Sequence, residues 1–373
     1  MRAYSPARTR DRRVYLGSHP VLFALLAATR RRRALRLGGT VLVHDREAFV
    51  AALTRIPLDR TAPGTTGGAA GRLTGGDLLF DQQGDTHRRS RRDTAELLGA
   101  AGVARLRPIW TELFEQRLRP LAHGHPLDLV PIAAEVAGAT ATALLELDID
   151  PLRLAAATQE AAAAAARAHL PGPRAPGTGR RAEEAAARLS TLVAREGGAG
   201  AGLAVMLAVA AITTTVAALP RAAAWAADAN LWGYADSPAL ADELLRVTAP
   251  TPLLPRVAAA DGELPGGCPV RAGDRMLLVA RHALDAHCRD PDPARPASAQ
   301  IAQLAFGVGT HACPGARLAR TQLGDFLRAL AVHEPRVVRA RADRKAALPA
   351  WRSLIIEAGP TRAGGQGLRA AKA

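Results

Sequence analysis

Residues 305–320 read AFGVGTHACPGARLAR, and this stretch decides the fold class. Its glycines allow the backbone to bend sharply and to approach a flat ligand closely. Cys313 comes directly before a predicted helix over 314–332, and Pro314 suits a first helical turn, where a missing N–H costs nothing. Unpaired backbone N–H groups and the positive end of the helix dipole favour the anionic form of a thiol in this place. The stretch therefore predicts a thiolate that faces a closely packed ligand.

The spacing of this stretch resembles the haem-ligand loop of the cytochromes P450. That loop reads Phe-x-x-Gly-x-x-x-Cys-x-Gly, and Phe306, Gly309, Cys313 and Gly315 match it. A thiolate ligand donates electron density to haem iron and assists O–O cleavage. The resemblance implies that Cys313 ligates the iron of a haem b, with Phe306, Gly307 and Gly315 also at the cofactor. The alternative, a buried cysteine in a glycine-rich turn, requires several fixed spacings to coincide.

Basic residues elsewhere follow the order in which cytochromes P450 place the side chains that hold the haem propionates. His87 and Arg91 lie four residues apart on a predicted helix over 86–99. The resemblance also implies that Arg256 and His311 contact the propionates, since cationic donors form charge-assisted hydrogen bonds with carboxylates. For Arg91, a solvated basic helix face is the alternative interpretation.

A charged pair lies on the predicted helix over 236–248, where Glu243 and Arg246 are three residues apart and share one face. Taken alone, this spacing is that of an ordinary surface ion pair. The resemblance implies instead a buried structural network that braces the haem loop.

The apolar segment near 201–219 resembles the helix that passes over the haem, but it departs from the family's Ala-Gly-x-acid-Thr motif. Thr214 falls at the position of the oxygen-handling threonine, and Thr213 replaces the acid. The resemblance makes both of them candidate catalytic residues, although a threonine has no useful pKa for general acid chemistry. The alternative is that Thr213 leaves the chemistry unchanged.

The substrate pocket is expected to be largely apolar, which suits a hydrophobic or mixed natural-product substrate. The lid region between 146 and 201 has room for only two helices, and this indicates an open pocket for a large or carrier-tethered substrate. By position in the family, the pocket residues are Leu207, Ala210, Ala211, Thr251, Pro252, Leu253 and Leu254, with the 60–82 loop and a turn near Trp351 to Ile355.

The expected fold is mainly α with a small β component, the triangular single domain of a cytochrome P450. Residues 1–18 are interpreted as an irregular basic N-terminus, 19–359 as the P450 domain and 360–373 as a flexible tail. Short strands are expected within 36–53 and 254–280. Further helices are expected over 19–34, 102–121, 128–146, 151–169, 180–196, 201–218 and 220–232.

The chain is strongly basic, with 49 Lys and Arg against 34 Asp and Glu and a formal charge of +15. The arginines are scattered and no aromatic residues alternate with them, which argues against a nucleic-acid partner. The resemblance implies electrons from a ferredoxin and a ferredoxin reductase. Positive charge near Cys313, with Arg317 and Arg320 as candidates, would attract an acidic ferredoxin.

Cysteine usage and hydropathy predict a cytoplasmic protein, which we expect to be a monomer. Three cysteines are too few for a disulfide framework. Cys268 and Cys288 fit no standard zinc spacing with His282 and His287 and are interpreted as scattered structural residues. No run reaches the ~20 apolar residues of a membrane span, and the apolar segment over 19–29 favours a buried first helix over a signal peptide.

These features predict a haem-thiolate oxidoreductase that oxidises a small or carrier-tethered natural-product intermediate with O2 and ferredoxin electrons. Thr213 keeps open an alternative, a P450-fold enzyme of oxidative coupling, peroxide-driven or isomerising chemistry. A second alternative is a haem-free P450-like activator of a glycosyltransferase. Such activators typically lack the cysteine, so the intact loop around Cys313 argues against this alternative.

Overall fold

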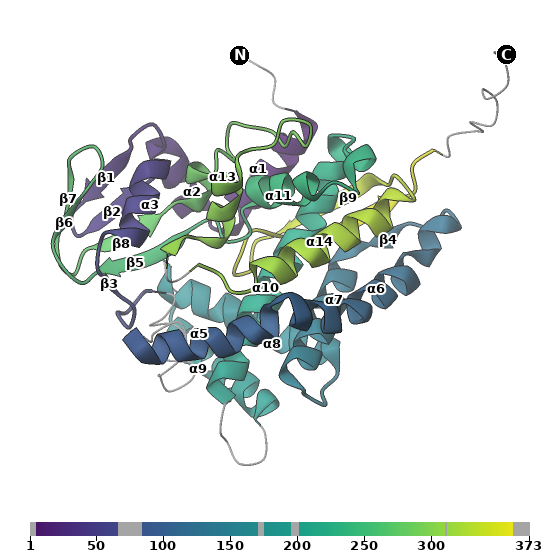
Figure 1. The fold of residues 1–373 in the computed structure, drawn as a ribbon, viewed down its shortest axis with the longest axis horizontal. Coiled ribbons are helices and arrows are strands. Elements are labelled where there is room, and N and C mark those ends of the chain that lie inside the picture. Colours follow the sequence, from purple (N-terminus) through teal and green to yellow (C-terminus); the bar gives the residue numbers. More distant parts are fainter. Residues whose placement is uncertain (1–4, 66–83, 171–174, 195–200, 310–311, 361–373) are drawn as a thin grey trace.

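The computed structural model describes residues 5–65, 84–170, 175–194, 201–309 and 312–360. Helices make up most of this part of the chain, and the strands gather mainly at one end of the molecule (Figure 1). The predicted mainly-α architecture with a small β component is therefore confirmed. The proposed tail over 360–373 lies outside the described residues apart from its first residue.

Helices begin where the sequence supplies a cap. Six of them start after a serine or aspartate whose side chain accepts a hydrogen bond from a first-turn N–H, namely Ser5, Asp45, Asp128, Asp150, Ser237 and Ser298. The α-helices are α1 (Pro6–Ser18), α2 (Pro20–Thr29), α3 (Arg46–Thr54), α5 (Gly84–Leu98), α6 (Ala100–Ala122), α7 (Leu129–Leu145), α8 (Pro151–His169), α9 (Thr178–Val193), α10 (Ala201–Asp228), α11 (Pro238–Thr248), α12 (Ala280–Ala283), α13 (Ala299–Gln303) and α14 (Ala316–Ala331). Two short 3₁₀ turns, η1 (Trp232–Tyr234) and η2 (Leu304–Phe306), complete the set.

The strands form three sheets, of which the largest delivers a basic residue to the functional site. This five-stranded sheet has the order β1-β2-β8-β5-β3, and only β2 and β8 pair in parallel. Its strands are β1 (Ala34–Leu37), β2 (Thr40–Val43), β3 (Leu58–Asp59), β5 (Leu254–Ala258) and β8 (Arg275–Leu278). The second sheet joins β4 (Leu127–Asp128), β10 (Ala350–Glu357) and β9 (Arg336–Asp343), and the third pairs β6 (Gly262–Leu264) with β7 (Cys268–Val270).

The N-terminal prediction was wrong, because residues 6–18 form the regular helix α1 rather than an irregular basic segment. Ser5 caps it, and Asp11 accepts hydrogen bonds from two buried arginines, Arg221 at 2.6 Å and Arg281 at 2.7 Å. This ion triad ties α1 to α10 and α12. The helix therefore depends on tertiary contacts that local sequence does not show. The next helix, α2, ends at Thr29 and not at 34, since β1 begins at Ala34.

The central helix α10 is continuous through Pro220, where the sequence had predicted a break between two helices. Leu219, Ala222 and Ala223 around the proline are buried, so the packing outweighs the lost backbone hydrogen bond. Helix α10 contacts α7, α8, α9, α11 and α14. It is long and apolar enough to cross a membrane by length and composition, but these contacts account for its apolar character as that of a core helix.

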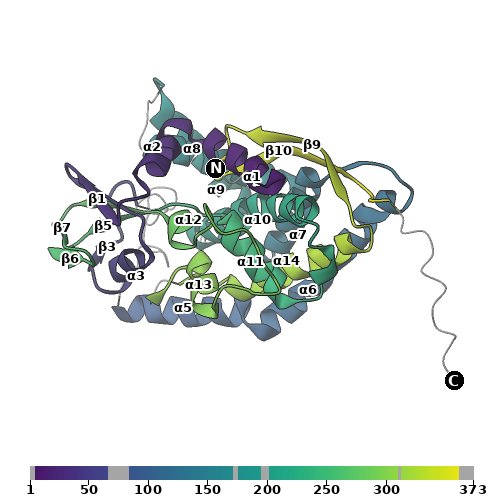
Figure 2. The same ribbon diagram turned by 90° about the horizontal axis from the view of Figure 1, so that it is seen from above.

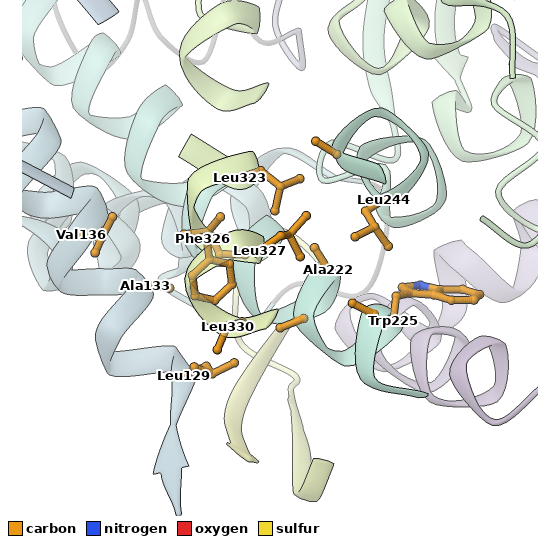
Figure 3. Close-up of a cluster of buried hydrophobic side chains, with 14 of the residues drawn as sticks. Leu129, Ala133, Val136, Ala222, Trp225, Leu244, Leu323, Phe326, Leu327 and Leu330 are labelled. Carbon is orange, nitrogen blue, oxygen red and sulfur yellow. The ribbon is translucent and has the colours of Figure 1, made fainter. Parts of the chain in front are cut away.

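The apolar face of α14 packs at the centre of the largest core cluster. Leu323, Phe326, Leu327 and Leu330 of α14 are buried among side chains of α7, α10 and α11 (Figure 3). Burying each such side chain stabilises the fold by about 1.5–3 kcal/mol. Figure 2 shows α14 beside α11, with α10 close by. This packing fixes the start of α14, and the preceding loop carries Cys313.

Two buried histidines make the stability of the fold pH-dependent. Nδ1 of His44 lies 2.8 Å from Nδ1 of His282, so one ring donates and the other accepts. Burial lowers the pKa of His44 to about 4 and that of His282 to about 2, with further lowering from His287, Arg281 and Arg30 around them. Both rings therefore stay neutral in the folded protein at a pH where the unfolded chain, with histidine pKa values of about 6.5, takes up protons.

Because the unfolded state binds more protons below pH 6.5, the free energy of unfolding should fall as the pH drops from 7.5 to 5. We expect a loss of about 2–4 kcal/mol over this range, measured by urea unfolding. In His44→Asn one of the two protonation sites is absent, so the loss should be smaller. Equal losses in the parent and in His44→Asn would contradict this account.

Candidate functional site

A largely apolar cavity of about 510 Å³ lies where α10, α5, β5 and the loop before α14 converge. Its walls come from segments far apart in the sequence. The walls include residues within 205–219 of α10, within 304–308 and 312–323, and within 250–256. A volume in this range is typical of small-molecule and cofactor sites.

The loop that carries Cys313 is held by its own backbone. The Cys313 N–H donates to the carbonyl of Phe306 at 2.7 Å, which closes the loop on itself. Gly307 and Gly309 adopt φ angles of 74° and 75°, a left-handed conformation that side chains disfavour. Gly315 precedes α14, and a Cβ there would lie 3.7 Å from Sγ of Cys313. The glycines therefore let the chain turn back so that the sulfur faces the cavity.

The Cys313 sulfur is exposed to the cavity rather than covered by other side chains. Enclosure by protein raises the pKa of the Cys313 thiol, and a hydrogen bond from the Gly315 N–H lowers it in part. The nearby charges of Arg91 and Arg320 also lower it. The net pKa of the Cys313 thiol is above its ordinary value. A cation such as a metal ion in the cavity would stabilise the anion.

Three arginines line the cavity, and no aspartate or glutamate does so within the part of the chain that the structure describes. They are Arg60 after β3, Arg91 of α5 and Arg256 of β5. Burial lowers the pKa of Arg256 to about 10, and repulsion from Arg60 contributes. Two neighbouring guanidinium groups in an apolar cavity favour an anionic ligand between them. Carboxylates of a haem have the charge that this arrangement requires.

The side chains of two of the predicted propionate ligands lie outside the described part of the structure. His87 lies within α5, but its side chain is outside the described residues, and His311 is also outside them. Arg91 and Arg256 line the cavity as expected. Arg60 was not singled out by the sequence, because it follows a two-residue strand whose pairing with β5 brings it beside Arg256. No local motif indicates this pairing.

The Glu243–Arg246 pair is buried, as the resemblance implied. Nη2 of Arg246 donates to Glu243 at 2.7 Å, and both side chains are at most 2% exposed. Arg246 also donates to the carbonyls of Leu284, Arg289 and Asp290, while Glu243 accepts from the N–H groups of Asp292 and Ala297. Burial raises the pKa of Glu243, but these hydrogen bonds outweigh it and lower the net pKa. The pair thus holds the coil over 289–297.

A second pair holds the start of α14. Arg320 donates to Asp242 of α11 at 2.6 Å, and its guanidinium lies 4.5 Å from the ring centroid of Phe306. Gln303 accepts a further bond from Arg320 at 3.4 Å. The sequence suggested Arg320 as a cation that attracts a ferredoxin. In the structure its guanidinium instead binds Asp242 and stacks on Phe306. Arg317 is exposed.

Thr213 and Thr214 of α10 line the same cavity as Cys313. Their hydroxyls donate to backbone carbonyls one turn earlier, Thr213 to Val209 at 2.5 Å and Thr214 to Ala210 at 2.7 Å. Because each hydroxyl proton is engaged, each oxygen presents lone pairs to the cavity as an acceptor. Thr215 lies 3.5 Å from the buried Gln322, which in turn donates to Thr140 at 3.0 Å.

Most of the predicted pocket residues line the cavity. Of the 60–82 loop, Arg60, Gly64 and Thr65 do so, and residues 66–82 lie outside the described residues. Leu207, Ala210, Ala211 and the segment Thr251 to Leu254 all lie on its walls. The turn predicted near Trp351 to Ile355 was wrong, because these residues belong to strand β10 and the hairpin residues Ala347, Leu348 and Pro349 line the cavity instead. The sequence did not indicate His19, His169 and Gln322, which tertiary packing brings to the walls.

The region between α7 and α10 contains the two helices predicted for it, α8 and α9. Residues of α8 line the cavity. Cys268 lies on β7 and Cys288 follows α12, and neither lines the cavity. The rings of His282 and His287 lie 4.9 Å apart, near Cys288 in the sequence, and no metal-binding group of His, Cys, Asp or Glu was found among the described residues.

Part of the sequence that forms this site matches a known protein family. Residues 238–331 match the Cytochrome P450 family. A 90-residue segment is 39% identical to erythromycin C-12 hydroxylase of Saccharopolyspora erythraea and covers 23% of this chain and 22% of that relative. The activity of the relative therefore belongs to a protein that this chain matches over less than a quarter of its length.

Solved structures resemble the chain over most of its length. P450BioI, in complex with an acyl carrier protein ligated to hexadec-9Z-enoic acid, aligns with a TM-score of 0.72 at 17% identity and covers 92% of this chain and 99% of its own. A mutant of P450 EryK in complex with erythromycin B aligns with a TM-score of 0.72 at 19% identity and covers 94% and 99%. At these identities the likeness establishes the fold.

Proposed function

Because this chain has the cytochrome P450 fold, we propose that it is a haem-thiolate oxidoreductase with Cys313 as the iron ligand. One observation carries the proposal: the Cys313 sulfur and three arginines line one apolar cavity, and no acidic side chain joins them among the described residues. Bound there, the haem would supply the redox chemistry that activates O2.

The residues of the chain divide the task of holding the cofactor. Cys313 supplies the metal ligand, Arg60, Arg91 and Arg256 supply cations for the propionates, and the left-handed glycines allow close approach. The Arg320 guanidinium lies over the ring of Phe306, and this contact stiffens the loop that carries Cys313. His87 and His311 are proposed as further propionate ligands on the resemblance alone. Purified protein should bind one haem per chain after haem supplementation, and a chain that binds none would contradict the proposal.

Thr213 and Thr214, which also line the cavity, can accept hydrogen bonds but carry no acidic proton. Both orient water or a substrate hydroxyl in the cavity by accepting its hydrogen bond. The described cavity wall provides no carboxylic acid to relay protons. We therefore propose that ordered water, or a group of the substrate itself, delivers the protons that O2 reduction requires.

Replacing Thr213 by aspartate should restore an internal proton donor. With a surrogate ferredoxin and reductase, we expect Thr213→Asp to release about 10- to 100-fold less hydrogen peroxide per NADPH consumed, since a positioned acid accelerates proton transfer by about 100-fold or more. Thr213→Asn is the matched control, of equal size without the acid, and should behave as the parent does. Peroxide release that is the same in all three proteins would remove Thr213 from the proton path.

The apolar walls and the two-helix lid support a substrate with a hydrophobic body. One solved relative is in complex with an acyl carrier protein ligated to hexadec-9Z-enoic acid and another with erythromycin B, and these complexes suggest two substrate classes. We propose a small or carrier-tethered natural-product intermediate. Electrons would come from a ferredoxin and its reductase, with the exposed Arg317 near Cys313 as a contact. We also propose that the chain works in the cytoplasm as a monomer.

A second candidate is a P450-fold enzyme that couples, isomerises or uses peroxide. The absence of an acid at Thr213 favours it, and the retained Thr214 argues against peroxide use. Product formation with hydrogen peroxide and no reductase would support this candidate. The third, a haem-free activator of a glycosyltransferase, conflicts with the cysteine that faces the cavity.

A further inference from the structure

A second pocket of about 360 Å³ adjoins the main cavity. It lies between the α1–α2 junction, α8, the start of α9 and the β9–β10 hairpin. Figure 2 shows α2, α8 and this hairpin on one edge of the molecule. His19, Ala166 and Leu170 line both spaces, so the two pockets share a wall. A ligand that extends from the main cavity past these three side chains would enter the second pocket.

The second pocket is basic. Arg167, Arg181, Arg344 and Lys345 line it, and within the described residues no aspartate or glutamate lines it. Arg167 donates to the carbonyl of Lys345 at 2.7 Å, which holds its guanidinium against the hairpin without neutralising it. Four positive charges on one small pocket repel one another, and an anion placed among them relieves this repulsion.

The start of α9 adds to this positive potential. Thr178, the first residue of the helix, lines the pocket. The helix starts after Gly177 without a side-chain cap, and its first turn contains no acidic residue. Backbone N–H groups and the helix dipole at such an end attract anions, phosphate above all. The N–H groups of Thr178 and Arg181 already donate to the carbonyls of Ala175 and Gly177, so it is the helix dipole that adds to the charge of the pocket and favours an anion.

We propose that this basic pocket, lined by Arg167, Arg181, Arg344 and Lys345, binds a phosphate group at the end of the substrate remote from Cys313. The inference rests on the proposed function, because it assigns a substrate class to the same cavity: an apolar body that ends in a phosphate. A free phosphate ester and the phosphate-bearing arm of a carrier protein share this chemistry. Four cations and a helix N-terminus can contact several phosphate oxygens at once, both in a dianionic monoester and in the monoanionic diester of a carrier arm, whereas a carboxylate offers only two oxygens.

Calorimetric titration of the haem-loaded full chain with octyl phosphate and with octanol tests the proposal. The parent should bind octyl phosphate about 10- to 100-fold more tightly than octanol, since hydrogen bonds to charged groups are among the stronger polar contacts. In the double variant Arg181→Gln/Arg344→Gln this advantage should be lost, while the affinity for octanol stays unchanged. Both arginines are exposed, so the fold should tolerate the substitutions.

The matched control is Arg180→Gln/Arg341→Gln. Arg180 is the neighbour of Arg181 on α9, Arg341 lies on β9, and neither lines the pocket. This variant has the same net charge as the test variant and should keep the parent's affinity for octyl phosphate within about twofold. An equal loss in both variants would show a general charge effect and would overturn the proposal, as would no loss in either.

Two further probes identify the source of the phosphate. Octanoate should bind more weakly than octyl phosphate, and equal affinities would overturn the assignment to phosphate. Octanoyl groups carried on a phosphopantetheine arm of an acyl carrier protein should lose affinity in Arg181→Gln/Arg344→Gln if the carrier is the source. If only octyl phosphate shows the loss, a free phosphate ester is the ligand. Haem content is measured separately, so a failure to bind haem is distinguishable from a failure of the basic pocket to bind phosphate.

Discussion

Cys313→Ala is expected to abolish electron-driven oxidation while leaving the fold intact. The side chain is exposed to the cavity and takes no part in the core, so its loss costs little stability. The thiolate would be absent, and with it the electron donation that assists O–O cleavage. Haem bound to the variant through Arg60, Arg91 and Arg256 should lack the absorption signature of sulfur ligation. Oxygen consumption and the haem spectrum measure the two effects.

Cys288→Ala is the matched control, because Cys288 is exposed but does not line the cavity. It should keep the parent's spectrum and turnover. If Cys313→Ala retained turnover, or if Cys288→Ala lost the sulfur signature, the assignment of the metal ligand would be wrong.

The second large effect is expected at Arg246. Arg246→Met keeps most of the side-chain volume but leaves the Glu243 carboxylate and three backbone carbonyls without their donor. Removing one partner of a buried ion pair costs about 3–5 kcal/mol. Urea unfolding should report a loss of this size, together with weaker haem retention, because the coil over 289–297 leads into α13 and η2, which precede the loop that carries Cys313.

Arg295→Met provides the comparison, since Arg295 pairs with Asp292 at the surface and is 89% exposed. It should cost at most about 1 kcal/mol. The double variant Glu243→Gln/Arg246→Met should be less destabilised than the sum of its single variants, because the unpaired charge is removed. Equal and small losses for Arg246→Met and Arg295→Met would mean that the buried pair does not brace the loop.

The loop around Cys313 could be predicted from the sequence because the constraints on its shape are local. The turn around Cys313 depends on glycines within a few residues of the sulfur. Arg91 and Arg256 reach the cavity on elements that the chain order of a known family anticipates. The helix over Pro6–Ser18 was missed because its stability depends on Asp11 meeting Arg221 and Arg281, more than 200 residues away.

Other features could not be predicted from the sequence, for similar reasons. The continuity of α10 through Pro220 follows from burial on both sides of the proline, which a local helix-breaking rule ignores. Arg60 and the basic pocket each arise where distant segments meet, and neither has a motif. The position of a side chain within a short motif was predictable, whereas the convergence of separate segments on one cavity was visible only in the fold.

The proposed ligation of haem iron by the Cys313 thiolate is best measured by the absorption spectrum of the reduced, CO-bound, haem-supplemented protein. We expect the red-shifted Soret band of a thiolate-ligated haem in the parent and its absence in Cys313→Ala. A parent protein that retains haem and lacks this band would show that Cys313 is not the ligand.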